Sequence, residues 1–290
     1  FKAQLSENWV AHIEGSFDRN EGLDGSYRRL TDAYVSRTSA TGWELKLLKQ
    51  SAGFTLDGAT SSRKLLTPER NNLTNNLWFT AEYFTGATVS GPCGADVSCK
   101  GGVFSSDGNE EFSKFDAGWF SLLTATWDMA AKTGQERLDL IGSWVHNDKD
   151  ENANTPQFTD IGSIVAQWEN GAWGIWSDLS FGRGFGAQSD VTGVVIMPIY
   201  NINDRLQWVL RYTWLRSDEV NGVRLGRYED EIVVGNGNEY REGFAGFNWF
   251  FHGHKLKWQT GLQFTRMVDD SDTGGNYDGW GMITGLRIYW

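Results

Sequence analysis

The chain has 290 residues and a formal net charge of −11 at pH 7, from 26 basic and 37 acidic side chains. This acidic balance argues against nucleic acid as a partner, because phosphate binding requires a basic face. No apolar run approaches the ~18 residues that a membrane-spanning helix needs, which excludes a helical membrane protein. It does not exclude a membrane β-barrel, whose strands are short and alternate.

Apolar and polar residues alternate with period two along most of the chain. Near the C-terminus, for example, Trp280, Met282 and Leu286 share one face of a strand and Arg287 lies on the other. This alternation predicts an all-β chain whose strands have one apolar and one polar face. We expect fifteen strands, at residues 1–5, 9–19, 27–38, 43–51, 84–91, 101–105, 117–128, 135–147, 161–168, 172–182, 190–200, 205–218, 239–251, 256–269 and 277–290.

Several of these strands exceed ten residues, and about 9–11 residues cross a bilayer at a tilt. The connections alternate in length, with long ones at residues 20–26, 52–83, 106–116, 148–160, 218–238 and 270–276. Short turns on one rim and long loops on the other are typical of a transmembrane antiparallel β-barrel of the bacterial outer membrane. Such barrels have an even strand number, so we expect a sixteenth strand before Phe1 and one barrel domain over residues 1–290.

Two other interpretations stay open. A soluble β-sandwich, such as a secreted Trp-rich binding protein, would alternate in the same way, although with shorter strands and unsorted loops. An outer-membrane β-barrel hydrolase would need a Ser or Asp beside His146 or His12, and no nucleophile motif lies near either residue in sequence. We therefore expect a protein that is not an enzyme.

The stretch at residues 51–73 reads SAGFTLDGATSSRKLLTPERNNL. It resembles the constriction-loop region of the phosphate-selective porin family, the O and P type, through its Thr-Ser-Ser-basic and Glu-Arg-Asn segments. Weaker matches follow in order at residues 32–35, 102–105 and 246–250. The resemblance implies a sixteen-stranded barrel, a homotrimer, and a long third loop, about residues 52–83, folded into the lumen.

Three positions depart from that family. Val10, Thr31 and Gly58 stand where alignment on Trp9, Ala33 and the Thr-Ser-Ser segment places the family's strand Lys, its Asp and its loop Lys. The sequence therefore supports the porin architecture without the phosphate ligands, and predicts weak anion preference or no selectivity.

Charged residues in the long loop and on the polar strand faces are the candidate pore residues. We expect the constriction to be lined by Arg63, Lys64, Arg70, Asp57 and Glu69. We expect four further side chains to face the lumen from strands, namely Lys46, Arg211, Lys257 and Arg287.

Cys93 and Cys99 flank five residues within one connection, and an oxidising compartment favours a disulfide between them. His252 and His254 lack acidic or Cys neighbours in sequence, so we expect a solvated turn and no metal or other cofactor.

Together these features predict a porin in the bacterial outer membrane for the passive diffusion of small ions and hydrophilic solutes. Its expected partners are outer-membrane lipid, lipopolysaccharide and two further copies of the chain.

Overall fold

The computed structural model describes residues 1–290 except 18–26, 79–82, 151, 221, 234 and 290. The described residues form one fifteen-stranded sheet, in which each strand pairs antiparallel with its neighbours in sequence. The strands are β1 (Lys2–Ser6), β2 (Trp9–Phe17), β3 (Tyr27–Thr38), β4 (Glu44–Ser51), β5 (Tyr83–Pro92), β6 (Val97–Ser105), β7 (Trp119–Asp128), β8 (Arg137–Asn147), β9 (Phe158–Asn170), β10 (Trp173–Gly184), β11 (Val191–Asn203), β12 (Leu206–Ser217), β13 (Glu239–Phe250), β14 (Leu256–Val268) and β15 (Tyr277–Ile288).

All fifteen strands expected from the period-two pattern are confirmed. β6 begins at Val97 rather than at residue 101, because a tight turn at residues 93–96 closes the β5–β6 hairpin. β1 and β15 are the two edges of the sheet within the described residues, so a sixteen-stranded closed barrel stays a prediction.

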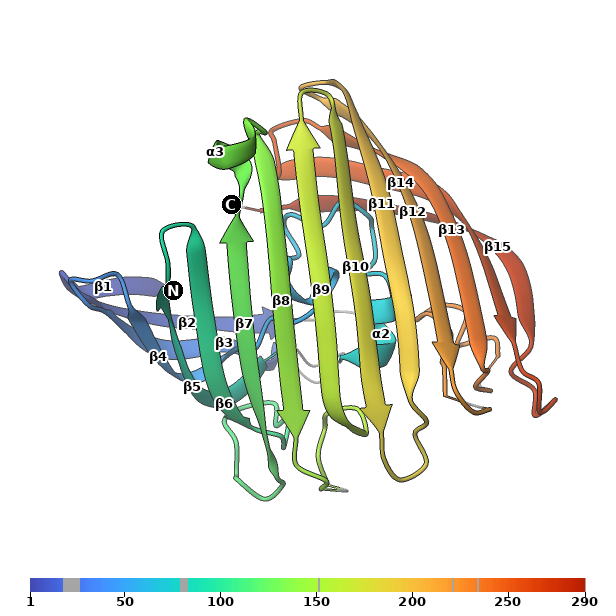
Figure 1. Ribbon diagram of the computed structural model, residues 1–290, viewed down its shortest axis with the longest axis horizontal. Helices are drawn as coiled ribbons and strands as arrows, with labels where there is room; N and C mark the ends of the chain where they lie inside the picture. Colours follow the sequence, from blue (N-terminus) through green and yellow to red (C-terminus); the bar gives the residue numbers. More distant parts are fainter. Residues whose placement is uncertain (18–26, 79–82, 151, 221, 234, 290) are drawn as a thin grey trace.

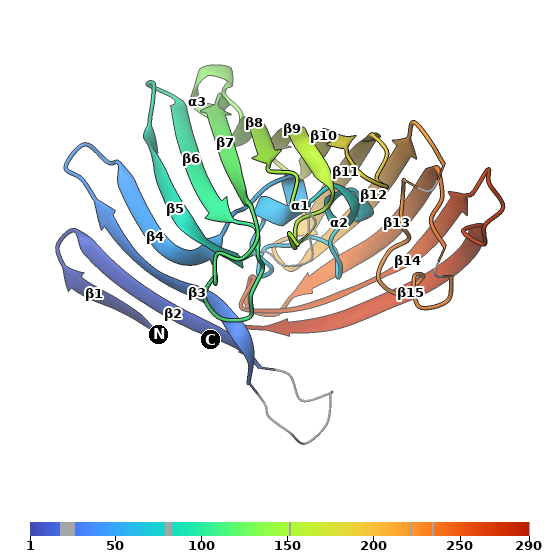
Figure 2. The ribbon, with the colours of Figure 1, turned by 90° about the horizontal axis from the view of Figure 1, so that it is seen from below.

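The sheet curves strongly, and its connections separate by length between the two rims (Figure 1). Short turns, including the one that holds α3 (Ala130–Thr133), lie on the upper rim, and the long connections that follow β6, β8 and β12 lie on the lower one. The long connection expected at residues 20–26 lies outside the described residues. Helices α1 (Leu56–Ala59) and α2 (Asn72–Leu77), both in the β4–β5 connection, lie inside the curve of the sheet (Figure 2). None of the helices in the described part of the chain is long and apolar enough to span a membrane.

Burial is inverted relative to a soluble β-protein. On β12 the apolar side chains of Trp208 and Leu210 are more than half exposed on the convex face, whereas Gln207 and Arg211 are buried on the concave one. The convex faces of other strands also carry exposed large apolar side chains, such as Trp280 on β15. A sandwich would bury this apolar face in a core, so the arrangement is that of a sheet whose apolar side faces lipid.

Candidate functional site: the β4–β5 loop and its cavity

Residues 52–83, here called the constriction loop, contain two capped short helices, α1 and α2. Asn71 caps α2 by accepting a hydrogen bond from the Thr74 backbone N–H at 2.8 Å. The Asp57 carboxylate at α1 accepts hydrogen bonds from both the backbone and the side-chain N–H of Asn71, each at 2.7 Å. Arg70 donates to the backbone carbonyls of Asp57 and Thr60. These contacts join the two helices into one unit.

One side of this unit packs on an apolar cluster. Phe54, Trp78 and Phe120 are fully buried, with ring centroids 5.2 Å apart for Phe54–Trp78 and 5.3 Å for Trp78–Phe120. The rings of Phe84 and Phe104, from β5 and β6, lie 4.9 and 4.8 Å from Phe120. Edge-to-face and stacked ring pairs of this kind stabilise by more than their buried area alone. The cluster therefore holds Phe54 and Trp78, which flank the helical part of the loop, against β5–β7, whereas α1 contacts β10 and α2 contacts β10–β12.

The other side of the loop meets a row of hydrogen-bonded polar side chains across β11–β15. Its links are Gln207 to Asn201 at 2.8 Å, Asn248 to Gln207 at 2.8 Å, Gln259 to Asn248 at 2.8 Å, and Arg287 to Gln259 at 2.7 Å. The row follows from the sheet register, since Gln207 pairs with Asn248 and Asn248 with Gln259 on adjacent strands. We call these five residues the polar ladder.

The polar ladder, together with Lys257 and Arg211, binds the backbone of residues 62–69. The Leu65 carbonyl accepts from Lys257 at 2.6 Å and from Gln259 at 3.1 Å, and the Leu66 carbonyl accepts from Asn248 at 3.0 Å. Arg287 donates to the carbonyls of Ser62 and Pro68. A buried carbonyl requires such a donor, so these strand residues fix the course of the loop.

Arg211 binds the same stretch of the loop and also forms a buried ion pair. Its guanidinium donates to the Thr67 hydroxyl at 2.7 Å and to the Glu69 carbonyl at 3.0 Å, and it forms a 2.8 Å ion pair with Glu242. The side chains of Arg211 and Glu242 are only 2% and 3% exposed. A buried ion pair of this kind makes the loss of either partner costly.

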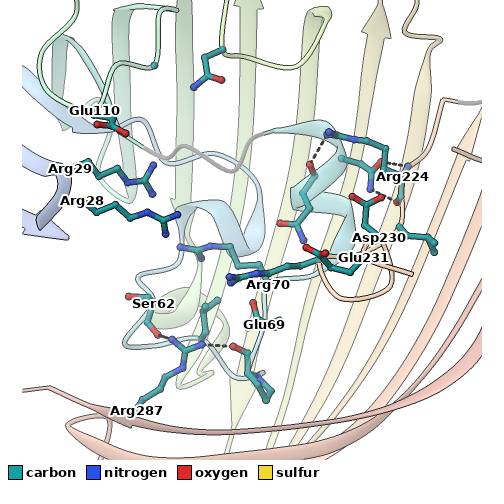
Figure 3. Close-up of a pocket in the computed structure, with 18 residues that line it drawn as sticks. Arg28, Arg29, Ser62, Glu69, Arg70, Glu110, Arg224, Asp230, Glu231 and Arg287 are labelled. Carbon is teal, nitrogen blue, oxygen red and sulfur yellow. Dashed lines mark hydrogen bonds between the residues drawn. The ribbon is translucent and has the colours of Figure 1, made fainter. Parts of the chain in front are cut away.

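A cavity of 870 Å³ lies between the constriction loop, β3 and β15, and the connections that follow β6, β8 and β12. Six arginines and four carboxylates line it, which makes its wall net positive: Arg28, Arg29, Arg70, Arg224, Arg227, Arg287, Glu69, Glu110, Asp230 and Glu231. Figure 3 shows Arg28 and Arg29 on one side, Asp230 and Glu231 on the other, and Arg70 and Glu69 between them. Glu110 lies on the side of Arg28 and Arg29, and Arg224 lies on the side of Asp230 and Glu231, so each side of the cavity carries both signs of charge.

A β-bulge places two successive arginines at the cavity. Tyr27 and Arg29 on β3 pair with Phe17 and Ser16, which are adjacent on β2, so β3 carries one extra residue, Arg28. Without the bulge, strict alternation would turn one of the two arginines toward the convex face. The period-two pattern contains no sign of the bulge, and the sequence analysis did not select either arginine.

The five expected constriction residues occupy different environments. Glu69 and Arg70 line the 870 Å³ cavity. Lys64 lines a second cavity of 360 Å³ between α1 and β7–β10. The Arg63 guanidinium lies 5.1 Å from the centre of the Tyr289 ring. The expectation that Asp57 is a lining group is wrong, because its side chain is buried and binds Asn71.

The four residues expected to face the lumen from strands also occupy different environments. Arg287 lines the 870 Å³ cavity. Arg211 and Lys257 lie on the concave face but are buried beneath the loop, so they anchor it and are not exposed lining groups. The Lys46 ammonium lies 4.5 Å from the centre of the Tyr34 ring.

The turn between β13 and β14 is part of the same assembly. Its residues are exposed, as expected for a solvated turn, but His254 Nδ1 also lies 3.1 Å from the Arg63 carbonyl oxygen and 3.3 Å from Lys257 Nζ. Burial, and then the nearby Lys257, lower the pKa of His254 below its ordinary value. A neutral His254 is therefore favoured beside the lysine.

The expected disulfide is present at the turn of the β5–β6 hairpin. Cys93 and Cys99 are bonded, with Cα atoms 5.9 Å apart. It closes the tight turn at residues 93–96, on the same rim as the other short connections.

His146 lies beside a carboxylate but not within hydrogen-bonding distance of a serine hydroxyl among the described residues. Its Nδ1 lies 2.9 Å from the Asp160 carboxylate, and Ser121 is its partner across the β7–β8 register. Among the described residues, no hydrogen bond joins Ser121 to His146. A serine hydrolase needs that bond to activate its nucleophile, together with N–H donors for an oxyanion.

No protein-family model matches the sequence, and no curated protein matches it. The fold is nevertheless similar to solved outer-membrane channels. OmpF of Salmonella typhi, in complex with daunomycin, matches with a TM-score of 0.67 at 10% identity, over 99% of this chain and 87% of that one. The outer membrane channel DcaP of Acinetobacter baumannii gives 0.61 at 12% identity, over 98% and 82%. OprB of Pseudomonas putida gives 0.63 at 11% identity, over 91% and 73%. The chain has the porin-like fold of outer-membrane β-barrel channels.

Proposed function

We propose that the protein is a porin of the bacterial outer membrane that lets small ions and hydrophilic solutes diffuse passively through a pore narrowed by the constriction loop. The observation that carries this proposal is the inverted sheet: apolar side chains are exposed on its convex face, and its concave face holds a charged cavity. Lipid can cover the first surface and water can fill the second. The porin-like fold supports the same conclusion, and no enzymatic activity is needed to explain the arrangement.

We propose a weak anion preference, because arginines outnumber carboxylates around the cavity. Charges at a narrow passage act on an ion at short range, whereas the acidic loops outside act through screening water. A tight phosphate site is not part of the proposal, since Val10, Thr31 and Gly58 replace the ligands of the phosphate-selective family.

Electrical recording of the purified protein in planar bilayers tests this function. We expect stepwise conductance and a reversal potential in a KCl gradient that corresponds to a small excess of chloride flux. Phosphate added to the chloride solution should block little current at low concentration. A protein that inserts in folded form but shows no conductance under voltage would contradict the proposal.

We propose that the protein is a homotrimer, and this proposal rests on the family resemblance alone. Mass measurement of the native protein in mild detergent should give three copies of the chain. A single copy under the same conditions would contradict this state without affecting the pore.

A further inference from the structure

Residues 222–233, here called the inner segment, follow β12 and turn toward the cavity. Val223 and Leu225 are buried, at 0% and 5% exposure, and belong to the same apolar cluster as Leu73 and Leu77 of the constriction loop. Val223 also pairs with Gly237 through two backbone hydrogen bonds of 2.9 and 2.8 Å. These contacts hold the start of the inner segment inside the sheet, although its sequence is that of a polar surface loop.

The inner segment is hydrogen-bonded directly to the constriction loop. The Arg224 carbonyl accepts from the side-chain amides of Asn72 and Asn76, at 2.8 and 3.1 Å, and the Arg224 N–H donates to Asn76 at 2.8 Å. Further along, the Tyr228 hydroxyl donates to the Glu69 carboxylate at 3.0 Å. The two loops therefore form one structure on the concave side of the sheet.

A third contact joins the inner segment to the wall. The Glu229 carboxylate lies 2.8 Å from the Gln263 amide nitrogen and 3.4 Å from the Thr265 hydroxyl, both on β14. With Glu229 held by the wall, the next two residues, Asp230 and Glu231, are exposed and line the cavity. They lie on the side opposite Arg28 and Arg29 (Figure 3).

We propose that the inner segment is a second constriction element and that Asp230 and Glu231 determine specificity by offsetting the arginines. This inference rests on the proposed pore. Without these two carboxylates the cavity wall keeps six arginines and only Glu69 and Glu110, so an entering anion meets far less repulsion. With them, four carboxylates offset four of the six arginines, so a solute that carries both positive and negative groups finds partners of each sign in the passage.

The double variant D230N/E231Q tests the proposal by reversal potential in a KCl gradient. We expect its chloride-to-potassium permeability ratio to rise by about twofold or more over that of the unaltered protein. The matched control D218N/E219Q removes the same charge from the outer end of the same connection, away from the cavity lining, and should change the ratio little. Equal ratios for the two variants would overturn the proposal.

A thiol probe tests the position independently of charge. Both native cysteines are in the disulfide, so E231C introduces the sole free thiol of the chain. A bulky methanethiosulfonate reagent should lower the single-channel current of E231C and leave that of E219C unchanged. If the unaltered protein conducts but the reagent affects E231C and E219C equally, this inference fails and the proposed pore stands. If the unaltered protein does not conduct, the proposed function itself fails.

Discussion

The two sides of the constriction loop are held by different forces. On the β5–β7 side, Phe54 and Trp78 pack on the rings around Phe120. On the β11–β15 side, the carbonyls of residues 62–69 accept hydrogen bonds from the polar ladder, Lys257 and Arg211. Ring packing fixes where the helices lie but tolerates small shifts, whereas hydrogen bonds to successive carbonyls fix the path of the backbone. The apolar side thus supports the loop, and the polar side sets the shape of the passage.

The largest expected loss of stability comes from the apolar side. Phe120→Ala removes the ring that contacts Trp78, Phe84 and Phe104, and should lower the free energy of unfolding by about 3–5 kcal/mol. Phe181→Ala, on the exposed convex face, is the matched control and should cost much less in detergent. Urea unfolding in detergent measures both variants. A loss below about 1 kcal/mol for Phe120→Ala would show that the cluster does not support the loop.

Loss of the Arg211–Glu242 ion pair on the polar side should lower the free energy of unfolding by a similar amount and should also change the current through the pore. Arg211→Ala leaves Glu242 buried without its cation and should destabilise by about 3–5 kcal/mol. Because Arg211 also binds Thr67 and the Glu69 carbonyl, we expect noisier current than in Phe120→Ala. The double variant R211M/E242Q removes both charges and should recover part of the stability while keeping the noise. If the current of both Arg211→Ala and R211M/E242Q is no noisier than that of the unaltered protein, the polar side does not set the shape of the passage.

A smaller effect is expected at Lys257. Lys257→Met removes the 2.6 Å bond to the Leu65 carbonyl, but Gln259 still donates to that oxygen at 3.1 Å. We expect a loss of about 1–3 kcal/mol in urea unfolding. Lys255→Met, in the adjacent turn and exposed, serves as the control. Equal stability of the two variants would mean that the Lys257 contact is dispensable.

The disulfide should have the smallest effect, because it lies at a rim turn away from both sides of the loop. Replacing both Cys93 and Cys99 by Ser should cost less than the roughly 3 kcal/mol that a 15-residue loop would give, since the closed loop is shorter. Conductance should be unchanged. A change in single-channel current would mean that this turn affects the passage.

The sequence predicted the strands better than the contacts of the loop. The period-two pattern located all fifteen strands, because each strand has one apolar and one polar face. Sequence could not assign Asp57 to an internal contact, because its partner, Asn71, is fourteen residues away.

Two further features of the site have no local signal. The bulge that adds Arg28 to the cavity breaks the period that identifies β3. The inner segment is a charged loop whose inward path depends on Asn72, Asn76 and Gln263, all remote in sequence. The bulge and the path of the inner segment depend on contacts between distant parts of the chain, and the alternation of residues along a single strand does not predict such contacts.

The central claim is that residues 52–83 narrow a water-filled pore. Single-channel conductance of a variant lacking residues 61–65 tests it most directly, because this deletion removes the Leu65 carbonyl that Lys257 and Gln259 bind. A deletion of residues 271–274, in the β14–β15 connection, is the control. We predict a higher conductance and a weaker anion preference for the first deletion and no change for the second. Unchanged conductance and selectivity in a folded protein that lacks residues 61–65 would contradict the account.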